Sequence, residues 1–289
     1  MKKAETRNPR SDELPALQSL WENTFGNIGK EAFFNHYYNP EMCVVAEWNH
    51  VPASAGYLIP YGEIQSDNES LPCAMIYSVA TLPECRGIGF GSAVVNGLIR
   101  LAYELGYSVI VLCPSEDGLF EYYKSHTQLC DWFYVEEQTI NNIPVGTAAS
   151  LPIPISAVEY STLREELLRG ITHIKHDLRA LEYQQMLCQE LGGGLCRIGN
   201  SCAVVERQPD GTVWVKEFLI PGGSINDLQS CPVASDAISA IMQIYPANNY
   251  IVRYPAGFGK GRRFGMLADC GNKGIKQNNS APWYGVAFD

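Results

Sequence analysis

The sequence has 289 residues, of which 46% are hydrophobic and 18% charged, and its formal net charge at pH 7 is −10. This size and composition predict a globular protein of one large domain or two ordinary ones. The acidic balance argues against a broad nucleic-acid-binding surface, because phosphate backbones are bound by basic patches. No segment approaches the roughly 18 uninterrupted apolar residues of a membrane helix, and the polar start lacks the apolar core of a secretory signal.

The first half of the chain alternates between helical and extended patterns. Leu14, Leu17 and Trp21 recur at helical spacing, and residues 108–113 form the continuous apolar run of a strand buried on both faces. The predicted elements are, in order, helices over 11–25 and 30–38, strands over 42–47, 54–60 and 73–82, a helix over 90–105, a strand over 108–113, a helix over 118–124 and a strand over 129–136.

Prolines then interrupt the periodicity over residues 143–154, which predicts a junction between a domain of residues 1–145 and a domain of residues 146–289. The spacing of Thr162 and Glu165 predicts a capping box. The second half has helical patterns over 161–170, 177–191 and 234–245 and extended patterns over 196–206, 212–220 and 250–254. The glycine-rich stretch 257–263 is followed by no helical pattern, and we interpret it as a mobile basic loop.

The ten cysteines are scattered, and no two have Cys-x-x-Cys spacing. Several lie within apolar runs, as Cys113 does, where a free cysteine packs like a small hydrophobic side chain. Together with the missing export signal, this pattern predicts reduced thiols and a cytoplasmic protein. The five histidines do not cluster with the cysteines, so we expect no metal site.

The strongest chemical signal lies in residues 76–92, which read IYSVATLPECRGIGFGS. An apolar run stops at Pro83, an arginine and three alternating glycines follow, and the pattern then becomes helical. The first turn of a helix offers N–H groups without internal partners at the positive end of the macrodipole, and glycines let an anion approach closely. The segment therefore predicts a site for a pyrophosphate. A turn without a ligand is the alternative, whereas a Rossmann site does not fit, because the G-x-G-x-x-G spacing is absent.

The run Arg86-Gly87-Ile88-Gly89-Phe90-Gly91 fits the R/Q-x-x-G-x-G/A signature, and residues 14–133 resemble the GNAT superfamily of acyl-CoA N-acyltransferases. The resemblance implies a mixed, mostly antiparallel α/β sheet flanked by helices, with acetyl-CoA as acyl donor. It assigns cofactor binding to Val79, Thr81, Arg86, Gly87, Ile88, Gly89, Phe90, Gly91 and Ser92.

Two catalytic roles also follow from the resemblance. The backbone N–H of Val79 would stabilise the developing oxyanion, and Tyr123 would protonate the departing thiolate as a general acid. The chain departs from the family pattern after this tyrosine, where Thr127-Gln128 replaces the usual Gly-Phe, and Glu116 stands where relatives often have asparagine. A packed helix aromatic is therefore the alternative interpretation of Tyr123.

No general base is evident from the sequence. The predicted strand over 73–82 contains no carboxylate, and the two candidates are Glu121 and the chain-terminal carboxylate of Asp289, since in some two-domain relatives the C-terminus reaches the active site.

The leading hypothesis is an N-acetyltransferase that moves an acetyl group from acetyl-CoA directly to a primary amine of a small molecule or peptide. The alternative is a catalytically inactive acyl-CoA-binding sensor or scaffold. The second half lacks an R-x-x-G-x-G motif and is a further α/β domain, under one hypothesis a degenerate second GNAT-like domain. No nucleic-acid or membrane partner is expected, and the oligomeric state is not indicated.

Overall fold

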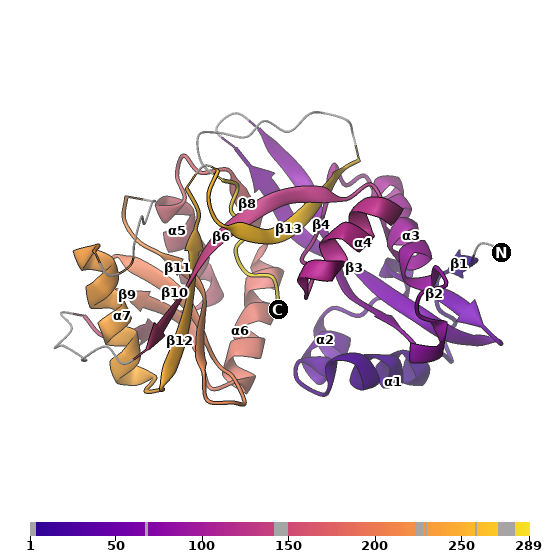
Figure 1. The fold of residues 1–289 in the computed structure, drawn as a ribbon, viewed down its shortest axis with the longest axis horizontal. Coiled ribbons are helices and arrows are strands. Elements are labelled where there is room, and N and C mark those ends of the chain that lie inside the picture. Colours follow the sequence, from indigo (N-terminus) through magenta and orange to yellow (C-terminus); the bar gives the residue numbers. More distant parts are fainter. Residues whose placement is uncertain are drawn as a thin grey trace. The chain divides into compact units, whose positions relative to one another are not determined.

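The computed structural model describes residues 4–66, 69–141, 150–222, 228, 230–257, 259–270 and 281–289. The chain divides into two compact units (Figure 1). Unit 1 comprises residues 1–62, 71–131 and 265–275, and unit 2 comprises residues 63–70, 132–264 and 276–289. The junction predicted at 145–146 lies outside the described residues.

Unit 1 contains a sheet in which neighbouring strands follow the order β1-β2-β3-β4-β5-β13. β1, β2 and β3 pair antiparallel, β4 and β5 pair parallel, and β13 pairs antiparallel with β5. The parallel pair requires a crossover, which α3 supplies. The elements are β1 (Thr6–Arg7), α1 (Leu14–Phe25), α2 (Lys30–His36), β2 (Cys43–Trp48), β3 (Val51–Gln65), β4 (Ser70–Thr81), α3 (Phe90–Glu104), β5 (Val109–Leu112), α4 (Asp117–His126) and β13 (Arg262–Asp269).

Unit 2 contains a sheet in the order β6-β12-β11-β10-β9-β7. β9, β10 and β11 form an antiparallel meander, β11 and β12 are parallel, and β6 is antiparallel to β12. The elements are β6 (Cys130–Asn141), β7 (Ile153–Pro154), α5 (Ala157–Leu167), β8 (His173–His176), α6 (Leu178–Glu190), β9 (Gly194–Ile198), β10 (Ser201–Arg207), β11 (Val213–Leu219), α7 (Pro232–Ile244) and β12 (Asn249–Pro255). The predicted mixed, mostly antiparallel α/β fold with a second α/β part is confirmed.

Apart from β8, which lies between α5 and α6, both units pass through the same order of elements. Each has two helices, then a three-stranded meander, a helix and a strand parallel to the last strand of the meander. Each sheet continues with an antiparallel strand taken from the other half of the sequence, because β6 pairs with β12 and β13 pairs with β5. The order of elements is therefore repeated although no sequence repeat is visible.

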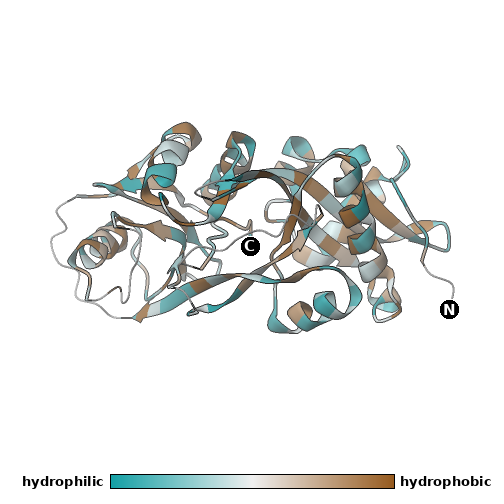
Figure 2. Ribbon diagram, turned by 90° about the horizontal axis from the view of Figure 1, so that it is seen from above, coloured by the Kyte–Doolittle hydropathy of each residue, from teal (hydrophilic) through white to brown (hydrophobic). Residues whose placement is uncertain are grey.

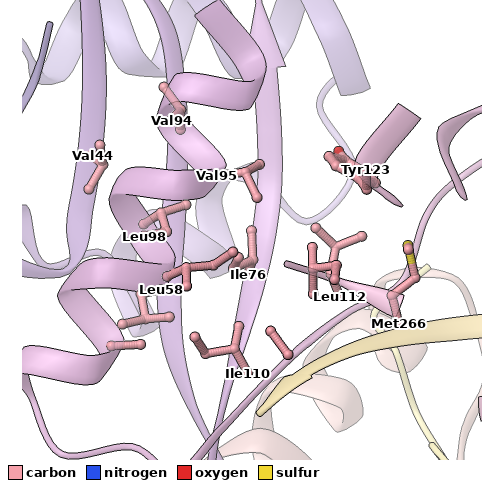
Figure 3. Packing of buried hydrophobic residues seen from close by; sticks show 14 of the residues in the cluster. Val44, Leu58, Ile76, Val94, Val95, Leu98, Ile110, Leu112, Tyr123 and Met266 are labelled. Atoms are coloured by element: carbon pink, nitrogen blue, oxygen red, sulfur yellow. The ribbon is translucent and has the colours of Figure 1, made fainter. Parts of the chain in front are cut away.

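The core of unit 1 holds α3 close to the sheet. In Figure 3, Val94, Val95 and Leu98 of α3 lie against side chains of the strands, and Tyr123 reaches the same cluster from α4. A Cβ on Gly97 would lie 2.9 Å from a methyl group of Val44, so the glycine permits this close approach. The helices carry both hydrophobic and hydrophilic residues along their length (Figure 2), as expected for helices with one buried face.

The predicted capping box at Thr162 and Glu165 is wrong. The helix begins earlier, and the Ser156 hydroxyl accepts a hydrogen bond from the Glu159 N–H at 3.2 Å while the Glu159 carboxylate accepts one from the Ser156 N–H at 3.0 Å. Thr162 lies inside the helix and donates to the carbonyl of Val158. The pair Ser156 and Glu159 has the same spacing as the pair Thr162 and Glu165, and the helical periodicity alone does not show which pair begins the helix.

The interpretation of residues 257–263 as a loop is wrong at its C-terminal end. Arg262 and Arg263 begin β13, and the Arg262 guanidinium pairs with Glu137 at 2.6 Å. Phe258 lies outside the described residues. The sequence did not indicate this strand, because its pairing with β5 joins residues far apart in the chain and leaves no local pattern.

Candidate functional site

The glycine-rich turn has the backbone conformation that the motif predicts. It follows β4 and a short 3-10 turn over Pro83–Cys85, and Gly87 and Gly89 have φ values of +74° and +95°. A Cβ at either glycine would meet no atom within 4 Å. Glycine is therefore required for its positive φ and not for lack of space.

Replacing Gly89 by alanine should destabilise the protein by about 1–2 kcal/mol, because L-residues are strained in the left-handed region. Gly118 is the matched control, since it lies in α4 with open space around it and no positive φ. There, alanine should stabilise by roughly 0.5–1 kcal/mol. Urea denaturation measures the free energy of unfolding of the two variants. Equal changes in the two would contradict a requirement for glycine at position 89 because of its positive φ.

The N-terminus of α3 is left uncapped by side chains. The helix has 15 residues, Gly89 is its N-cap, no side chain accepts from the first turn, and no acidic residue lies there. The Ser92 hydroxyl donates to the carbonyl of Gly89 at 3.1 Å. Phe90 is buried and packs edge-on against Trp48, whereas Ile88 is exposed. The first turn thus presents N–H groups and a positive dipole end suited to an anion.

Arg86 is exposed and attached to the end of β4. Its Nε donates to the carbonyl of Thr81 at 3.1 Å. The Thr81 hydroxyl lies 2.8 Å from the hydroxyl of the buried Ser54, which is 2.8 Å from the carbonyl of Ala80. These bonds hold a cationic side chain beside the turn, and a guanidinium is well suited to pair with a phosphate there.

β4 extends beyond its pairing with β5. The parallel register between the two strands runs from Cys73 to Met75, whereas β4 continues to Thr81. Ser78 has a φ of +49°, which is rare for a non-glycine residue and marks a local irregularity in the strand. Val79 follows it and packs against the core. The residue type at position 78 does not signal this irregularity.

Tyr123 lies on α4 at the core of unit 1. The side chain is buried, and burial together with the neighbouring Tyr122 raises the pKa of its phenol above the ordinary tyrosine value. A raised pKa keeps the phenol protonated, as a proton donor requires. The altered ending after this tyrosine has a structural role, because the Thr127 N–H and hydroxyl both donate to the Tyr123 carbonyl, at 2.9 and 2.6 Å.

Tyr122 also lies beside the glycine turn, a placement that sequence reasoning missed. Its hydroxyl is 3.4 Å from the position that a Cβ on Gly91 would occupy, and the Thr81 hydroxyl is equally close to that position. The signal in the sequence was a second tyrosine next to Tyr123, but helical periodicity does not reveal which of two adjacent residues reaches a neighbouring helix.

The two candidate bases are both paired with cations. Glu121 is exposed and lies 3.5 Å from the ammonium of Lys124. In unit 2, the terminal main-chain oxygen of Asp289 accepts a hydrogen bond from the Lys216 ammonium. The side-chain carboxylate of Asp289 is a separate group, which pairs with Arg253 at 2.8 Å. Burial raises the pKa of this side chain, but Arg253 and Lys216 outweigh it and the pKa is lowered. A carboxylate with a lowered pKa is a weak base.

Other site types find no support in the described residues. Within the described ranges, no group of three or more His, Cys, Asp or Glu side chains could hold a metal ion. All ten cysteines are free. None of the helices described here combines the length and hydropathy needed to cross a membrane.

The chain is similar to known proteins in part of its sequence and in its fold. Residues 5–125 match the family model of the acetyltransferase (GNAT) domain. A GCN5-related N-acetyltransferase from Kribbella flavida has a similar structure, with a TM-score of 0.63 and 12% identity over 92% of this chain and 70% of that chain. A GCN5-related N-acetyltransferase from Anabaena variabilis has a TM-score of 0.63 and 13% identity, over 93% of this chain and 73% of that chain.

Eis1 from Mycobacterium abscessus gives a TM-score of 0.60 and 10% identity over 92% of this chain and 74% of that chain. A search of curated proteins found no match. At these identities the structural likeness shows the fold alone, whereas the family model identifies the N-terminal part. Residues 5–125, which carry the glycine turn, α3 and Tyr123, are a GNAT acetyltransferase domain.

Proposed function

We propose that this protein is an N-acetyltransferase that transfers the acetyl group of acetyl-CoA directly to a primary amine of a small molecule or peptide. The observation that carries the proposal is the uncapped start of α3 behind the turn at Gly87 and Gly89, with Arg86 held beside it. This arrangement fits a pyrophosphate, and it lies in a GNAT acetyltransferase domain.

In the proposed reaction each residue has a defined task. Acetyl-CoA supplies an activated thioester, so no covalent enzyme intermediate is needed. The amine nitrogen forms the new bond to the acyl carbon as the C–S bond breaks. The Val79 N–H would stabilise the negative charge on the acyl oxygen, a contribution of about 3–4 kcal/mol for a well-placed donor. The Tyr123 phenol would donate its proton to the departing sulfur, and the proton lost from the amine replaces it through solvent.

Reversing the charge of Arg86 tests the cofactor assignment. The variant Arg86→Glu should weaken binding of acetyl-CoA by about tenfold or more, because it replaces a charge-assisted hydrogen bond by repulsion. Arg100→Glu is the matched control, since Arg100 is an exposed arginine on α3, away from the N-terminus of that helix. Isothermal titration with acetyl-CoA compares the two variants with the wild type. No binding by the wild type, or equal affinity of the two variants, would contradict the assignment.

The inactive acyl-CoA-binding sensor or scaffold is the second candidate. It is favoured by the lack of a carboxylate on β4 and by the cation pairing of Glu121 and Asp289. It predicts tight binding of CoA and no release of free thiol from acetyl-CoA on a broad panel of amines. Turnover with any amine on the panel would exclude it.

We further propose that unit 2 is a GNAT-like domain without its own cofactor turn. The repeated order of elements supports the relationship. The helix that corresponds to α3 is α7, and it begins with Pro232 after Cys231, which has an extended conformation instead of the left-handed one of Gly89. A proline at this position removes one of the N–H groups that an anion would bind. Binding of CoA with a stoichiometry of one per chain is therefore expected.

A further inference from the structure

Three hydroxyl groups from three elements converge on the start of α3. Ser54 on β3 and Thr81 at the end of β4 share a hydrogen bond at 2.8 Å. The Thr81 and Tyr122 hydroxyls both lie 3.4 Å from the position that a Cβ on Gly91 would occupy. Gly91 is the second residue of α3, so the two hydroxyls flank the first turn whose N–H groups face the predicted pyrophosphate site.

The side chain of Tyr122 is held in this position by its surroundings. Its ring lies 4.7 Å from the ring of His126, centre to centre, and it packs against the core of unit 1. Asn96 on α3 donates to the carbonyl of His126 at 2.9 Å and to the carbonyl of Ser92 at 2.8 Å. α4 is thereby tied to the first turns of α3, which fixes the phenol relative to the turn.

The position of Tyr122 differs from that of Tyr123 in burial. Tyr123 is 7% exposed and belongs to the core cluster, whereas Tyr122 is only partly buried and borders that cluster. A half-buried phenol at a helix start can donate its proton in a hydrogen bond to an anionic oxygen. Such a bond is stronger than one between neutral groups.

We propose that Tyr122 is a cofactor-binding residue whose hydroxyl, beside that of Thr81, donates a hydrogen bond to a phosphate oxygen of acyl-CoA at the start of α3. The inference rests on the proposed function and adds to it a donor from α4. The two adjacent tyrosines then have different roles. Tyr122 binds a phosphate of acyl-CoA, and Tyr123 acts at the thioester.

The test compares Tyr122→Phe with Tyr103→Phe, a matched loss of a phenol from an exposed position near the end of α3. Isothermal titration should show Kd values for CoA and for acetyl-CoA that both rise about tenfold in Tyr122→Phe, as expected when a hydrogen bond to a charged group is lost. Tyr103→Phe should bind like the wild type. The melting temperatures of the two variants confirm that both fold.

A second substrate localises the contact. S-Acetylpantetheine carries the thioester but lacks the pyrophosphate, so its kcat/KM should be the same for Tyr122→Phe and the wild type. A lower kcat/KM on this substrate would overturn the proposal by placing the phenol at the thioester. Equal affinity of Tyr122→Phe and the wild type for CoA would also overturn it while leaving the proposed function intact. If the wild type binds no CoA, both fail.

A second variant probes the same contact from the other side. Gly91→Val places an apolar branch between the Thr81 and Tyr122 hydroxyls and should weaken CoA binding at least as much as Tyr122→Phe. In the Tyr122→Phe background, Gly91→Val should weaken CoA binding by a smaller factor than in the wild type, because the hydrogen bond from Tyr122 is already lost. Full additivity of the two changes would contradict a shared contact.

Discussion

Replacing Tyr123 by phenylalanine should lower kcat by about a hundredfold or more, the range expected when a general acid is removed. The KM for acetyl-CoA should change little, since in the proposed reaction the phenol acts on the departing sulfur and not on the phosphates. Burial raises the pKa of Tyr123 above the usual value of about 10. The phenol therefore stays protonated, and the wild-type rate should show no alkaline decline from this group below pH 10.

Steady-state kinetics with acetyl-CoA and an accepted amine measures this effect across the pH range. Tyr103→Phe again serves as the control, because that exposed side chain lies outside the core cluster. An unchanged kcat in Tyr123→Phe would show that the tyrosine only packs in the core. An alkaline limb that disappears in the variant would contradict the raised pKa.

The largest effect on stability is expected at Glu217, a fully buried carboxylate on β11 in unit 2. It accepts hydrogen bonds from the Tyr160 hydroxyl at 2.8 Å, from Arg164 Nε at 2.9 Å and from the Trp283 indole N–H at 2.5 Å. Arg164 is 1% exposed. Removing one partner of a buried ion pair leaves the other charge without compensation, and Glu217→Leu should therefore cost about 3–5 kcal/mol.

A double variant separates the charge effect from lost packing. Glu217→Leu with Arg164→Met removes both charges, and it should be less destabilised than the sum of the two single variants predicts. Glu22→Gln is the control for loss of an exposed ion pair, the one with Lys30, and should lower the free energy of unfolding far less, because solvent screens exposed pairs. Urea unfolding followed by tryptophan fluorescence measures all four. If Glu217→Leu lowered the free energy of unfolding no more than Glu22→Gln does, the stabilising role of the buried Glu217 would be contradicted.

The local parts of the candidate site were predictable from the sequence. Gly87 and Gly89 have positive φ, and a glycine at such a position is recognisable because few other residues adopt that conformation. The helix after the turn was predicted at 90–105 and is observed at Phe90–Glu104, since its apolar residues recur at helical spacing over four turns. A turn and an amphipathic helix depend on residues close together in the chain.

The left-handed conformation of Ser78 and the end of the β4–β5 pairing at Met75 were not predictable. Serine has no intrinsic preference for that conformation, so the residue type does not predict it. The same holds for the hydroxyl of Tyr122 beside Gly91. Its position follows from how α4 packs on α3, which the residues of α4 alone do not specify.

The sequence by itself determined most of the order of helices and strands, the glycine turn before α3 and the resemblance to GNAT acyltransferases, because these depend on short-range periodicity and on glycines at required φ values. Only the tertiary structure decided that β13 pairs with β5 and that β6 pairs with β12. The same holds for the hydrogen bonds that Glu217 accepts from Tyr160, Arg164 and Trp283, and for the position of Tyr122 at the start of α3. These contacts join residues far apart in the chain. They are stabilised by burial and pairing within the folded unit, and no local pattern of residues in the sequence predicts them.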